Sequence, residues 1–413
     1  MKILVSDPLA AEGLAVLRSR GLDVDARANI PADELKRIIG EYGALIVRSE
    51  TKVTADLIAA GKKLKVIGRA GVGVDNVDVE AATKKGVVVM NTPGGNTIST
   101  AEHTVSMLLS LNRNIPQANA SMKAGEWNRK KFKGVELLGK TLGIIGLGRI
   151  GIEVAKRAVA FGMKIVAYDP FLSVEKARQL DIELLELSEL YKRADYITVH
   201  TPLNNETKHM ISGKEFALMK KGVKIINCAR GGIVDEAALQ EAVQQGIVSG
   251  AALDVFEEEP PKKELPLLKM ESVLTTPHLG ASTEEAQINV SVEIAQQVAD
   301  MLQNKGIRNA VNYPCLASEV CSVLDPYVRF GEKLGRLQSQ IITGHIRKVS
   351  IKYGGEILKN EVVPITVAIL KGLLSSMMGE TVNFVNAPMI ARERGISVSE
   401  TKLPETDQVA NLI

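Results

Sequence analysis

The sequence has few of the residues on which several protein classes depend. Only three of its 413 residues are cysteines, Cys228, Cys315 and Cys321, so we expect reduced thiols and a cytoplasmic location rather than a disulfide-stabilised fold. Aromatic residues make up 4%, with Trp127 the single tryptophan, which leaves little for stacking on bases. Lys and Arg outnumber Asp and Glu by only 51 to 48, a net charge of +3. A charge this small does not hold a phosphate backbone, so we expect no nucleic-acid partner.

Long apolar segments are also missing. The N-terminal sequence MKILVSDP has three consecutive apolar residues before Ser6 and Asp7, whereas a secretory signal needs about 7–15. Nowhere do about 18 residues run apolar without charge, so we expect no membrane span and no membrane partner. Gly and Pro are also too few, at 35 and 15, for a low-complexity chain. These absences leave a globular protein, whose length suggests two or three domains.

Short apolar runs alternate with amphipathic segments in two series. The expected strands lie at 2–7, 44–49, 64–71 and 87–94 in the first series, and at 141–146, 164–170, 196–202, 223–230, 249–255 and 273–278 in the second. Runs of Val, Ile and Leu between helices are typical of parallel strands buried on both faces. Crossovers between parallel strands are normally right-handed. The sequence therefore predicts an α/β protein with two doubly wound parallel-sheet domains.

Two long helices and a small third module complete the expected architecture. Ser99 with Glu102, and Ser282 with Glu285, have the spacing of capping boxes and predict the two helix starts. Beyond about residue 311 we expect a smaller α+β module. Its expected strands lie at 347–357, 381–388 and 396–403, and its helices at 365–379 and 388–395.

A glycine-rich motif opens the second series. Gly146, Gly148 and Gly151 follow the strand TLGII and begin a helix, and Asp169 ends the next strand, 18 residues after Gly151. In a dinucleotide site these glycines permit the tight turn, backbone approach to the pyrophosphate and close helix–strand packing. The helix N-terminus favours the phosphates, and Asp169 favours NAD over NADP because it would repel a 2′-phosphate. The alternative is a glycine-rich turn with a surface aspartate.

Three polar residues follow later strands of this series: Arg230, Glu259 and His278. Ligands of doubly wound sheets bind beyond the carboxyl ends of the strands. The Arg can bind a substrate carboxylate, the His can exchange the hydroxyl proton, and the acid can orient the His. This set predicts hydride transfer between a nicotinamide cofactor and a 2-hydroxy acid.

The other histidines have simpler interpretations. We expect His103 to pack within a helix, and His209 and His345 to lie on the surface. His200 either lines the cofactor cleft or has a structural role. An isolated His278 would also be structural, and only the complete set of three favours catalysis.

These motifs make the sequence resemble the D-isomer-specific 2-hydroxyacid dehydrogenase family from Met1 to about residue 310. The resemblance rests on the strings ALIVRS, GRAGVGVDNVD, VMNTPGGNTISTAEH, WNRKKFKGVEL, LGIIGLGRIG, NCARGGIVDE, ALDVFEEEP and TPHLGAST. Two of them, WNRKKFKG and GRAGVGVDN, point to the phosphoglycerate branch of the family.

The resemblance implies roles for particular residues. Arg230 would bind and polarise the substrate, Glu259 would support the histidine, and His278 would be the acid–base. Asp254 would hold the nicotinamide carboxamide. The implied cofactor shell contains Gly146, Gly148, Arg149, Ile150, Gly151, Asp169, Thr201, Cys228, Ala229, Asp254, Gly280 and Ala281. The implied substrate-domain face of the cleft contains Arg48, Ser49, Gly73, Val74 and Asn96.

Two further features have open interpretations. Arg129, Lys130 and Lys131 form a basic cluster that would suit a substrate phosphate, and in related enzymes this loop can reach a neighbouring subunit; the alternative is a solvated loop. Cys228 is either a reactive nucleophile or, as we favour, a small buried residue near the cofactor.

The resemblance also implies an architecture. A Rossmann-type NAD-binding domain, residues 99–282, would be inserted in a flavodoxin-like substrate domain, residues 1–98 and 283–310. Residues 311–413 resemble the start of the intervening domain of the longer relatives, and no residues remain for a complete serine-binding ACT domain. Either the chain is truncated or it lacks serine control, and the alternative for this module is a plain oligomerisation role. Our hypothesis is that there is no serine feedback. A homodimer built through the nucleotide domains, or a tetramer, is a family trait.

The implied reaction is NAD-dependent oxidation of 3-phospho-D-glycerate, a phosphorylated 2-hydroxy acid, to 3-phosphohydroxypyruvate, the first step of serine biosynthesis. No metal is expected. The alternatives are a hydroxypyruvate or glyoxylate reductase of the same family, and a dinucleotide-sensing binding protein or co-repressor.

Overall fold

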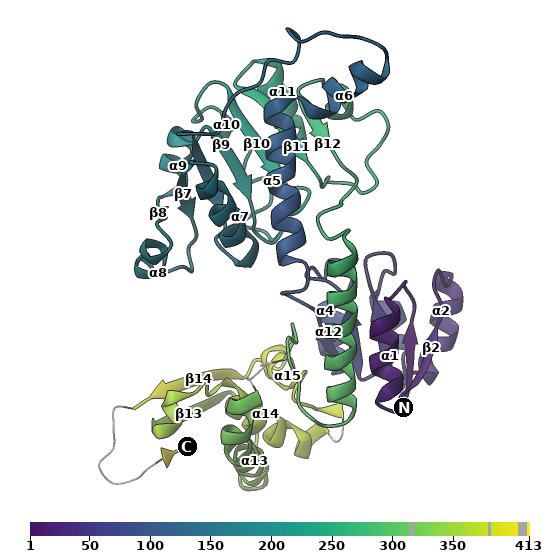
Figure 1. Cartoon of the computed structure of the whole chain (residues 1–413). Helices are drawn as coiled ribbons and strands as arrows, with labels where there is room; N and C mark the ends of the chain where they lie inside the picture. Colours follow the sequence, from purple (N-terminus) through teal and green to yellow (C-terminus); the bar gives the residue numbers. More distant parts are fainter. Residues whose placement is uncertain (314–317, 379–380, 404–410) are drawn as a thin grey trace. The chain divides into compact units, whose positions relative to one another are not determined.

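The computed structural model describes residues 1–313, 318–378, 381–403 and 411–413. The chain forms two compact units, one of Met1–Gly95 with Gln287–Ile413 and the other of Asn96–Ala286 (Figure 1). Each unit contains a parallel sheet, and a third, three-stranded sheet lies in the C-terminal part. The predicted α/β class is therefore confirmed.

The sheet of the first unit has the flavodoxin-like order β2-β1-β3-β4-β5, and all its pairs are parallel. Its strands are β1 (Lys2–Val5), β2 (Asp23–Ala26), β3 (Ala44–Val47), β4 (Val66–Arg69) and β5 (Val88–Met90). Helices α1 (Ala11–Ser19) and α12 (Glu284–Leu302) contribute to the apolar core on one face, and α2 (Ala32–Ile38), α3 (Ala55–Ala60) and α4 (Val79–Lys85) to the core on the other. Burial on both faces explains why the central strands are continuous apolar runs.

The second unit has a seven-stranded parallel sheet of order β12-β11-β10-β9-β6-β7-β8, the Rossmann order with one more strand. Its strands are β6 (Thr141–Ile145), β7 (Lys164–Tyr168), β8 (Glu183–Leu184), β9 (Tyr196–Val199), β10 (Val223–Asn227), β11 (Val248–Leu253) and β12 (Val273–Thr275). Helices α5 (Thr97–Arg113) and α7 (Arg149–Ala160) pack on one face. The other face is covered by α9 (Leu187–Arg193), α10 (Gly213–Phe216) and α11 (Glu236–Gln244). The short helices α6 (Ile115–Lys123) and α8 (Val174–Gln179) complete the unit.

Both predicted capping boxes are wrong. Ser99 lies inside α5, whose N-cap is Asn96, and its hydroxyl donates to the Gly280 carbonyl at 2.8 Å. At α12 the capping side chain is Thr283, one residue later than predicted, and its Oγ1 accepts the Ala286 N–H at 3.2 Å. At α12 a neighbouring polar side chain takes the capping position, whereas at α5 the Asn96 side chain makes no capping bond.

The C-terminal module is built on a sheet of order β14-β13-β15, in which β13 (Lys348–Gly355) pairs parallel with β14 (Ser397–Lys402) and antiparallel with β15 (Asn411–Leu412). Its helices are α13 (Ser318–Ile341), α14 (Val363–Met378) and α15 (Ala387–Glu393). Glycines bring α13 and α14 together, because a Cβ at Gly335 or Gly372 would lie 2.0 Å from a carbonyl oxygen of the other helix.

The strand predicted at 381–388 is wrong. The segment is a turn that leads into α15. The Asn383 Oδ1 accepts the N–H groups of Val385 and Asn386 at 2.9 and 3.1 Å, and the Asn386 Oδ1 accepts the Asn383 N–H at 2.7 Å. Such local bonds from asparagine compete with a sheet ladder.

The structure describes the side chain of one of the three cysteines. Cys228 is a buried free thiol, whereas Cys315 lies outside the described residues and the side chain of Cys321 is not described. Among the described helices, none combines the length and apolar character that a membrane crossing requires.

Candidate active site

The glycine motif forms a tight loop between β6 and α7. Gly146 has φ +93°, and a Cβ there would lie 2.7 Å from the His200 carbonyl oxygen. A Cβ at Gly151 would lie 2.1 Å from the Gly146 oxygen. At Gly148, by contrast, no described residue places a heavy atom within 4 Å of a Cβ position. The loop is therefore packed behind Gly146 and Gly151 and open at Gly148, at the N-terminus of α7, where a phosphate is favoured.

Asp169 ties this loop to the end of β7. Its Oδ2 accepts the Leu147 N–H at 2.7 Å, and its Oδ1 accepts the N–H groups of Phe171 and Leu172 at 2.8 and 3.1 Å. The carboxylate is thus held beside the glycine loop, as recognition of a ribose hydroxyl requires.

Two buried polar atoms next to the loop have no hydrogen-bond partner in the described part of the chain: His200 Nδ1 and Thr201 Oγ1. The other ring nitrogen of His200 lies 3.0 Å from Thr198 Oγ1. Burial lowers the pKa of His200 to about 4, so its ring is neutral at pH 7. Together with the opening at Gly148, these unpartnered atoms fit a polar ligand that extends along the loop, such as a dinucleotide.

Arg230 lies in a loop that Asn227, the last residue of β10, organises. The Asn227 side chain accepts the Ala229 N–H at 3.0 Å and donates to the Arg230 carbonyl at 2.9 Å. A Cβ at Gly231 would lie 1.7 Å from the Phe256 oxygen, so this loop contacts the loop that leads to Glu259.

Glu259 and His278 are in direct contact. Their Oε2 and Nδ1 atoms are 2.7 Å apart, and the second carboxylate oxygen accepts the Phe256 N–H at 3.1 Å. Burial alone would raise the pKa of Glu259. The opposing contributions are larger, and the net pKa is lowered. They come from the hydrogen bond and charge of His278, the Phe256 N–H and the charge of Arg230. Glu259 is therefore an anion that holds Nδ1, while 47% of the His278 side chain stays accessible.

Asp254 organises the turn that carries His278. It is fully buried, and its carboxylate accepts the N–H groups of Leu279 and Gly280 at 2.7 and 2.9 Å and the Thr276 hydroxyl at 2.6 Å. His103 Nε2 lies 3.1 Å from the same carboxylate. His103 was expected only to pack within its helix. Sequence spacing carries no signal for this contact, because the partners belong to α5 and to the end of β11.

Cys228 lies in the apolar core, beneath the loop of Arg230. Burial and the charge of Asp254 raise the pKa of its thiol, so the sulfur is protonated at neutral pH. This environment favours a small buried residue over a nucleophile. Of the other residues of the expected cofactor shell, Arg149 and Ile150 begin α7, Ala229 lies in the loop of Arg230, and Ala281 follows the Gly280 turn.

The expected substrate-domain residues lie in the first unit, except Asn96, which precedes α5 in the second. Arg48 and Ser49 follow β3, and Gly73 and Val74 follow the neighbouring β4, so all four lie at one sheet edge. The Arg48 N–H donates to Asp7 Oδ2 at 2.6 Å. Arg48 Nε is buried and has no bond to any described residue, as expected of a group that awaits an anionic ligand.

Arg129 is not brought to this site within one chain. It is exposed, in a loop between α6 and β6. The neighbouring Val135 N–H donates to the carbonyl of Asn112 at the end of α5, whereas Thr100 at the start of α5 contacts Gly280. A helix of 17 residues is about 25 Å long, so the two ends of α5 are well separated. In Figure 1, α6 and the following loop lie at the far end of α5 from its first turn.

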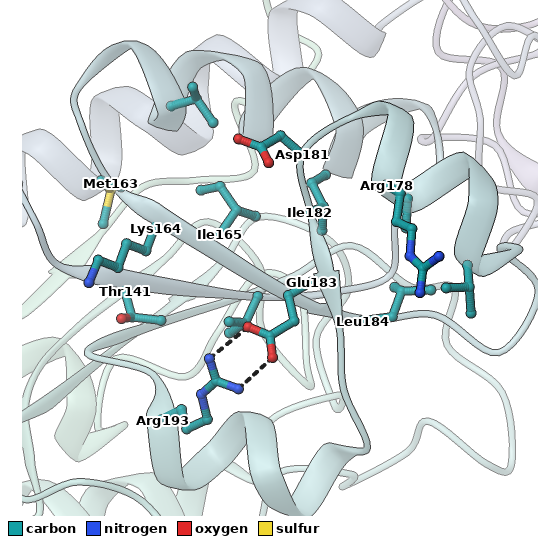
Figure 2. Close-up of a pocket in the computed structure, with 14 residues that line it drawn as sticks. Thr141, Met163, Lys164, Ile165, Arg178, Asp181, Ile182, Glu183, Leu184 and Arg193 are labelled. Carbon is teal, nitrogen blue, oxygen red and sulfur yellow. Dashed lines mark hydrogen bonds and ion pairs between the residues drawn. The ribbon is translucent and has the colours of Figure 1, made fainter.

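A cavity of about 680 Å³ lies at the amino-terminal ends of β6, β7 and β8, whereas the glycine loop follows the carboxyl end of β6 (Figure 2). Thr141, Lys164 and Glu183, the first residues of β6, β7 and β8, line it. Figure 2 shows Arg193 bound to Glu183 through two contacts, of 2.7 and 2.8 Å. Because ligands of doubly wound sheets bind at the carboxyl ends of the strands, this cavity is not the cofactor site.

Comparisons with known proteins agree with this geometry. Residues 105–280 match the D-isomer specific 2-hydroxyacid dehydrogenase NAD-binding domain, and residues 323–413 match the D-3-phosphoglycerate dehydrogenase intervening domain. The D-3-phosphoglycerate dehydrogenases of Archaeoglobus fulgidus and Methanocaldococcus jannaschii are 47% and 50% identical to this chain. They match 100% and 98% of it, which corresponds to 78% and 77% of their own lengths. The structure of a D-lactate dehydrogenase from Aquifex aeolicus, complexed with NAD and lactic acid, is 30% identical with a TM-score of 0.65 and covers 74% of this chain and 97% of its own. The chain therefore belongs to the D-isomer-specific 2-hydroxyacid dehydrogenase family.

Proposed function

We propose that this chain is an NAD-dependent dehydrogenase that oxidises 3-phospho-D-glycerate to 3-phosphohydroxypyruvate, the first step of serine biosynthesis. The observation that carries the reaction type is the 2.7 Å contact between His278 and Glu259, on loops that adjoin Arg230. The substrate assignment is supported by relatives of this name that are 47–50% identical over nearly the whole chain. A glyoxylate or hydroxypyruvate reductase finds less support, because the intervening-domain match extends over residues 323–413.

In this proposal each residue has a defined task. The glycine loop and Asp169 hold NAD, which when bound accepts a hydride from the substrate. Arg230 binds the substrate carboxylate through its planar guanidinium. His278 accepts the hydroxyl proton in the oxidation and returns it in the reduction. Glu259 keeps the ring oriented and stabilises its protonated form. The remaining expected contacts, from Arg48, Ser49, Gly73, Val74 and Asn96 to the substrate and from Asp254 to the nicotinamide, belong to the same proposal.

The proposal extends to domains, assembly and location. The NAD-binding domain comprises residues 99–282, the substrate domain 1–98 and 283–310, and the C-terminal module 311–413. A homodimer through the nucleotide domains is supported by the exposed apolar side chains of Trp127 and Leu138, 76% and 72% accessible. In such a dimer Arg129 of a second copy supplies the cation for the substrate phosphate. The free thiol of Cys228 is consistent with a cytoplasmic location.

The reaction is tested by product identification. The purified protein is incubated with NAD and 3-phospho-D-glycerate, and the product is trapped with hydrazine and analysed by mass spectrometry. We expect the hydrazone of 3-phosphohydroxypyruvate from the wild-type protein, and at least about a hundredfold less from His278→Ala. The absence of product from wild-type protein that binds NADH would overturn the proposal.

A further inference from the structure

His278 has an unusual backbone conformation. Its φ is +56°, in the left-handed region that non-glycine residues rarely adopt. A residue stays there only when its surroundings hold it. The contacts that hold this turn identify the residues that set the position of the catalytic ring.

The turn is held from both sides. Asp254 accepts the His278 N–H at 2.8 Å with its backbone carbonyl, and the N–H groups of Leu279 and Gly280 with its carboxylate. From α5, Ser99 and Thr100 donate their hydroxyls to the Gly280 carbonyl at 2.8 and 3.1 Å. One fully buried carboxylate therefore fixes two consecutive peptide groups of the turn.

A buried carboxylate needs strong partners to remain charged. Burial alone would raise the pKa of Asp254. Hydrogen bonds from His103, Thr276 and Leu279 oppose this effect, and the net pKa is lowered. The bond from His103 makes the largest of these contributions. His103 lies on α5, with its Nε2 atom 3.1 Å from Asp254 Oδ1 and 3.3 Å from Thr276 Oγ1. Within the described part of the chain, the titratable groups that face Asp254 are His103 from α5 and Cys228 from the end of β10, and the thiol is protonated.

We propose that His103 is a positioning residue of the reaction: it holds the buried Asp254 carboxylate, which in turn holds the 278–280 turn and the ring of His278. The inference rests on the proposed function, because it assigns His103 an effect on the acid–base residue. His103 acts in this proposal only through Asp254, which its Nε2 atom contacts.

The proposal distinguishes a hydrogen-bond donor from a packed side chain. His103→Gln keeps an N–H donor near the position of Nε2, whereas His103→Leu keeps bulk without a donor. Misplacement of a catalytic group by about 1 Å can cost about a hundredfold in rate, so we expect kcat/KM to fall about ten- to a hundredfold in the Leu variant. The Gln variant should retain activity within about threefold of wild type.

The pH profile provides a second readout. Without the hydrogen bond from His103, the effect of burial on Asp254 is opposed by fewer contacts. The pKa of Asp254 therefore rises, and its carboxylate becomes protonated at a higher pH. The acid limb of kcat/KM should therefore move to higher pH in His103→Leu and stay in place in His103→Gln. His345→Leu, an exposed histidine of the C-terminal module, is the matched control and should behave as wild type.

The experiment measures kcat/KM for 3-phosphohydroxypyruvate against pH, the NADH dissociation constant by NADH fluorescence, and urea unfolding of the four proteins. The proposal would be overturned if His103→Leu and His103→Gln lost kcat/KM equally while the acid limb of the pH profile stayed in place. It would also be overturned if both variants behaved as the wild-type protein does. If the wild-type protein turns over no substrate, the proposed function fails on its own. NADH binding that is weakened in Leu and restored in Gln would then still support the role of His103, and equal binding would refute it.

Discussion

At the scale of single residues, the chemistry depends on how Glu259 is held against His278. The pKa of Glu259 is lowered in the folded protein. Its charge is therefore fully present above the ordinary glutamate pKa of about 4.3 and is lost as the pH falls through the lowered folded pKa. The carboxylate is therefore available to the histidine throughout the neutral range.

Glu259→Gln tests this residue pair. The amide still accepts the Phe256 N–H but carries no charge, so it stabilises the protonated ring less well. Carbonyl reduction needs that protonated ring, so we expect kcat to fall about ten- to a hundredfold. The measurement is kcat/KM by NADH absorbance between about pH 6 and 9. An unchanged profile would show that Glu259 does not act on His278 through its charge.

At this scale the sequence predicts the roles of residues that follow the ends of strands or belong to a motif with a known spacing. Glu259 and His278 were paired from chemistry, and the structure places them 2.7 Å apart. His103 was assigned only to packing, because its partner Asp254 lies 151 positions away and only the packing of α5 on the sheet brings them together. Helical periodicity indicates that a residue faces the core, not which polar atom it meets there.

At the scale of elements, different glycines of the glycine loop contribute to folding and to cofactor binding. A Cβ at Gly151 would clash with the carbonyl oxygen of Gly146. Gly148 has an extended backbone, and a Cβ there would meet no atom of the described structure. One position thus serves the packing of α7 on β6, and the other leaves room for the pyrophosphate.

Alanine at the two glycines should have opposite effects. Gly151→Ala overpacks the helix start, and we expect it to lower the free energy of unfolding by about 1–3 kcal/mol. Gly148→Ala should unfold as wild type does while its NADH dissociation constant rises about tenfold or more. Urea unfolding and a fluorescence titration measure the two quantities. If both variants lost only stability, the loop would be no more than a structural turn.

Elements with continuous apolar runs were predicted well, and the failures have physical reasons. β2 reads DVDA and is an edge strand with exposed ends, so it shows no buried run. β8 has only two residues, too few for a period. At 381–388 the apolar alternation suggested a strand, but two asparagines bond locally and form a turn. Apolar pattern alone does not reveal such competition between side chain and backbone.

At the scale of the whole molecule, the proposal needs a second copy of the chain. Arg129 is exposed in the loop between α6 and β6, which contacts the end of α5 far from the turn of His278, and the same segment exposes Trp127 and Leu138. Both observations are consistent with an interface that brings this loop to a neighbouring cleft.

A charge at this surface tests the assembly. We expect Leu138→Glu to shift the protein from dimer to monomer in sedimentation velocity at micromolar concentration, because a charge in an apolar interface is costly. Leu218→Glu, at another exposed leucine of the same unit, is the control and should remain dimeric. A wild-type protein that sediments as a monomer would refute the dimer and the role of Arg129 in it.

The most direct test of the account compares substrates with and without the phosphate. We would measure kcat/KM for NADH-dependent reduction of 3-phosphohydroxypyruvate, hydroxypyruvate and glyoxylate, with wild-type protein and Arg129→Ala. The account predicts a preference of about a hundredfold or more for the phosphorylated substrate, consistent with a charge-assisted contact, and a reduced preference in the variant. Equal or higher efficiency with hydroxypyruvate or glyoxylate would contradict it and place the chain among the reductases of the family.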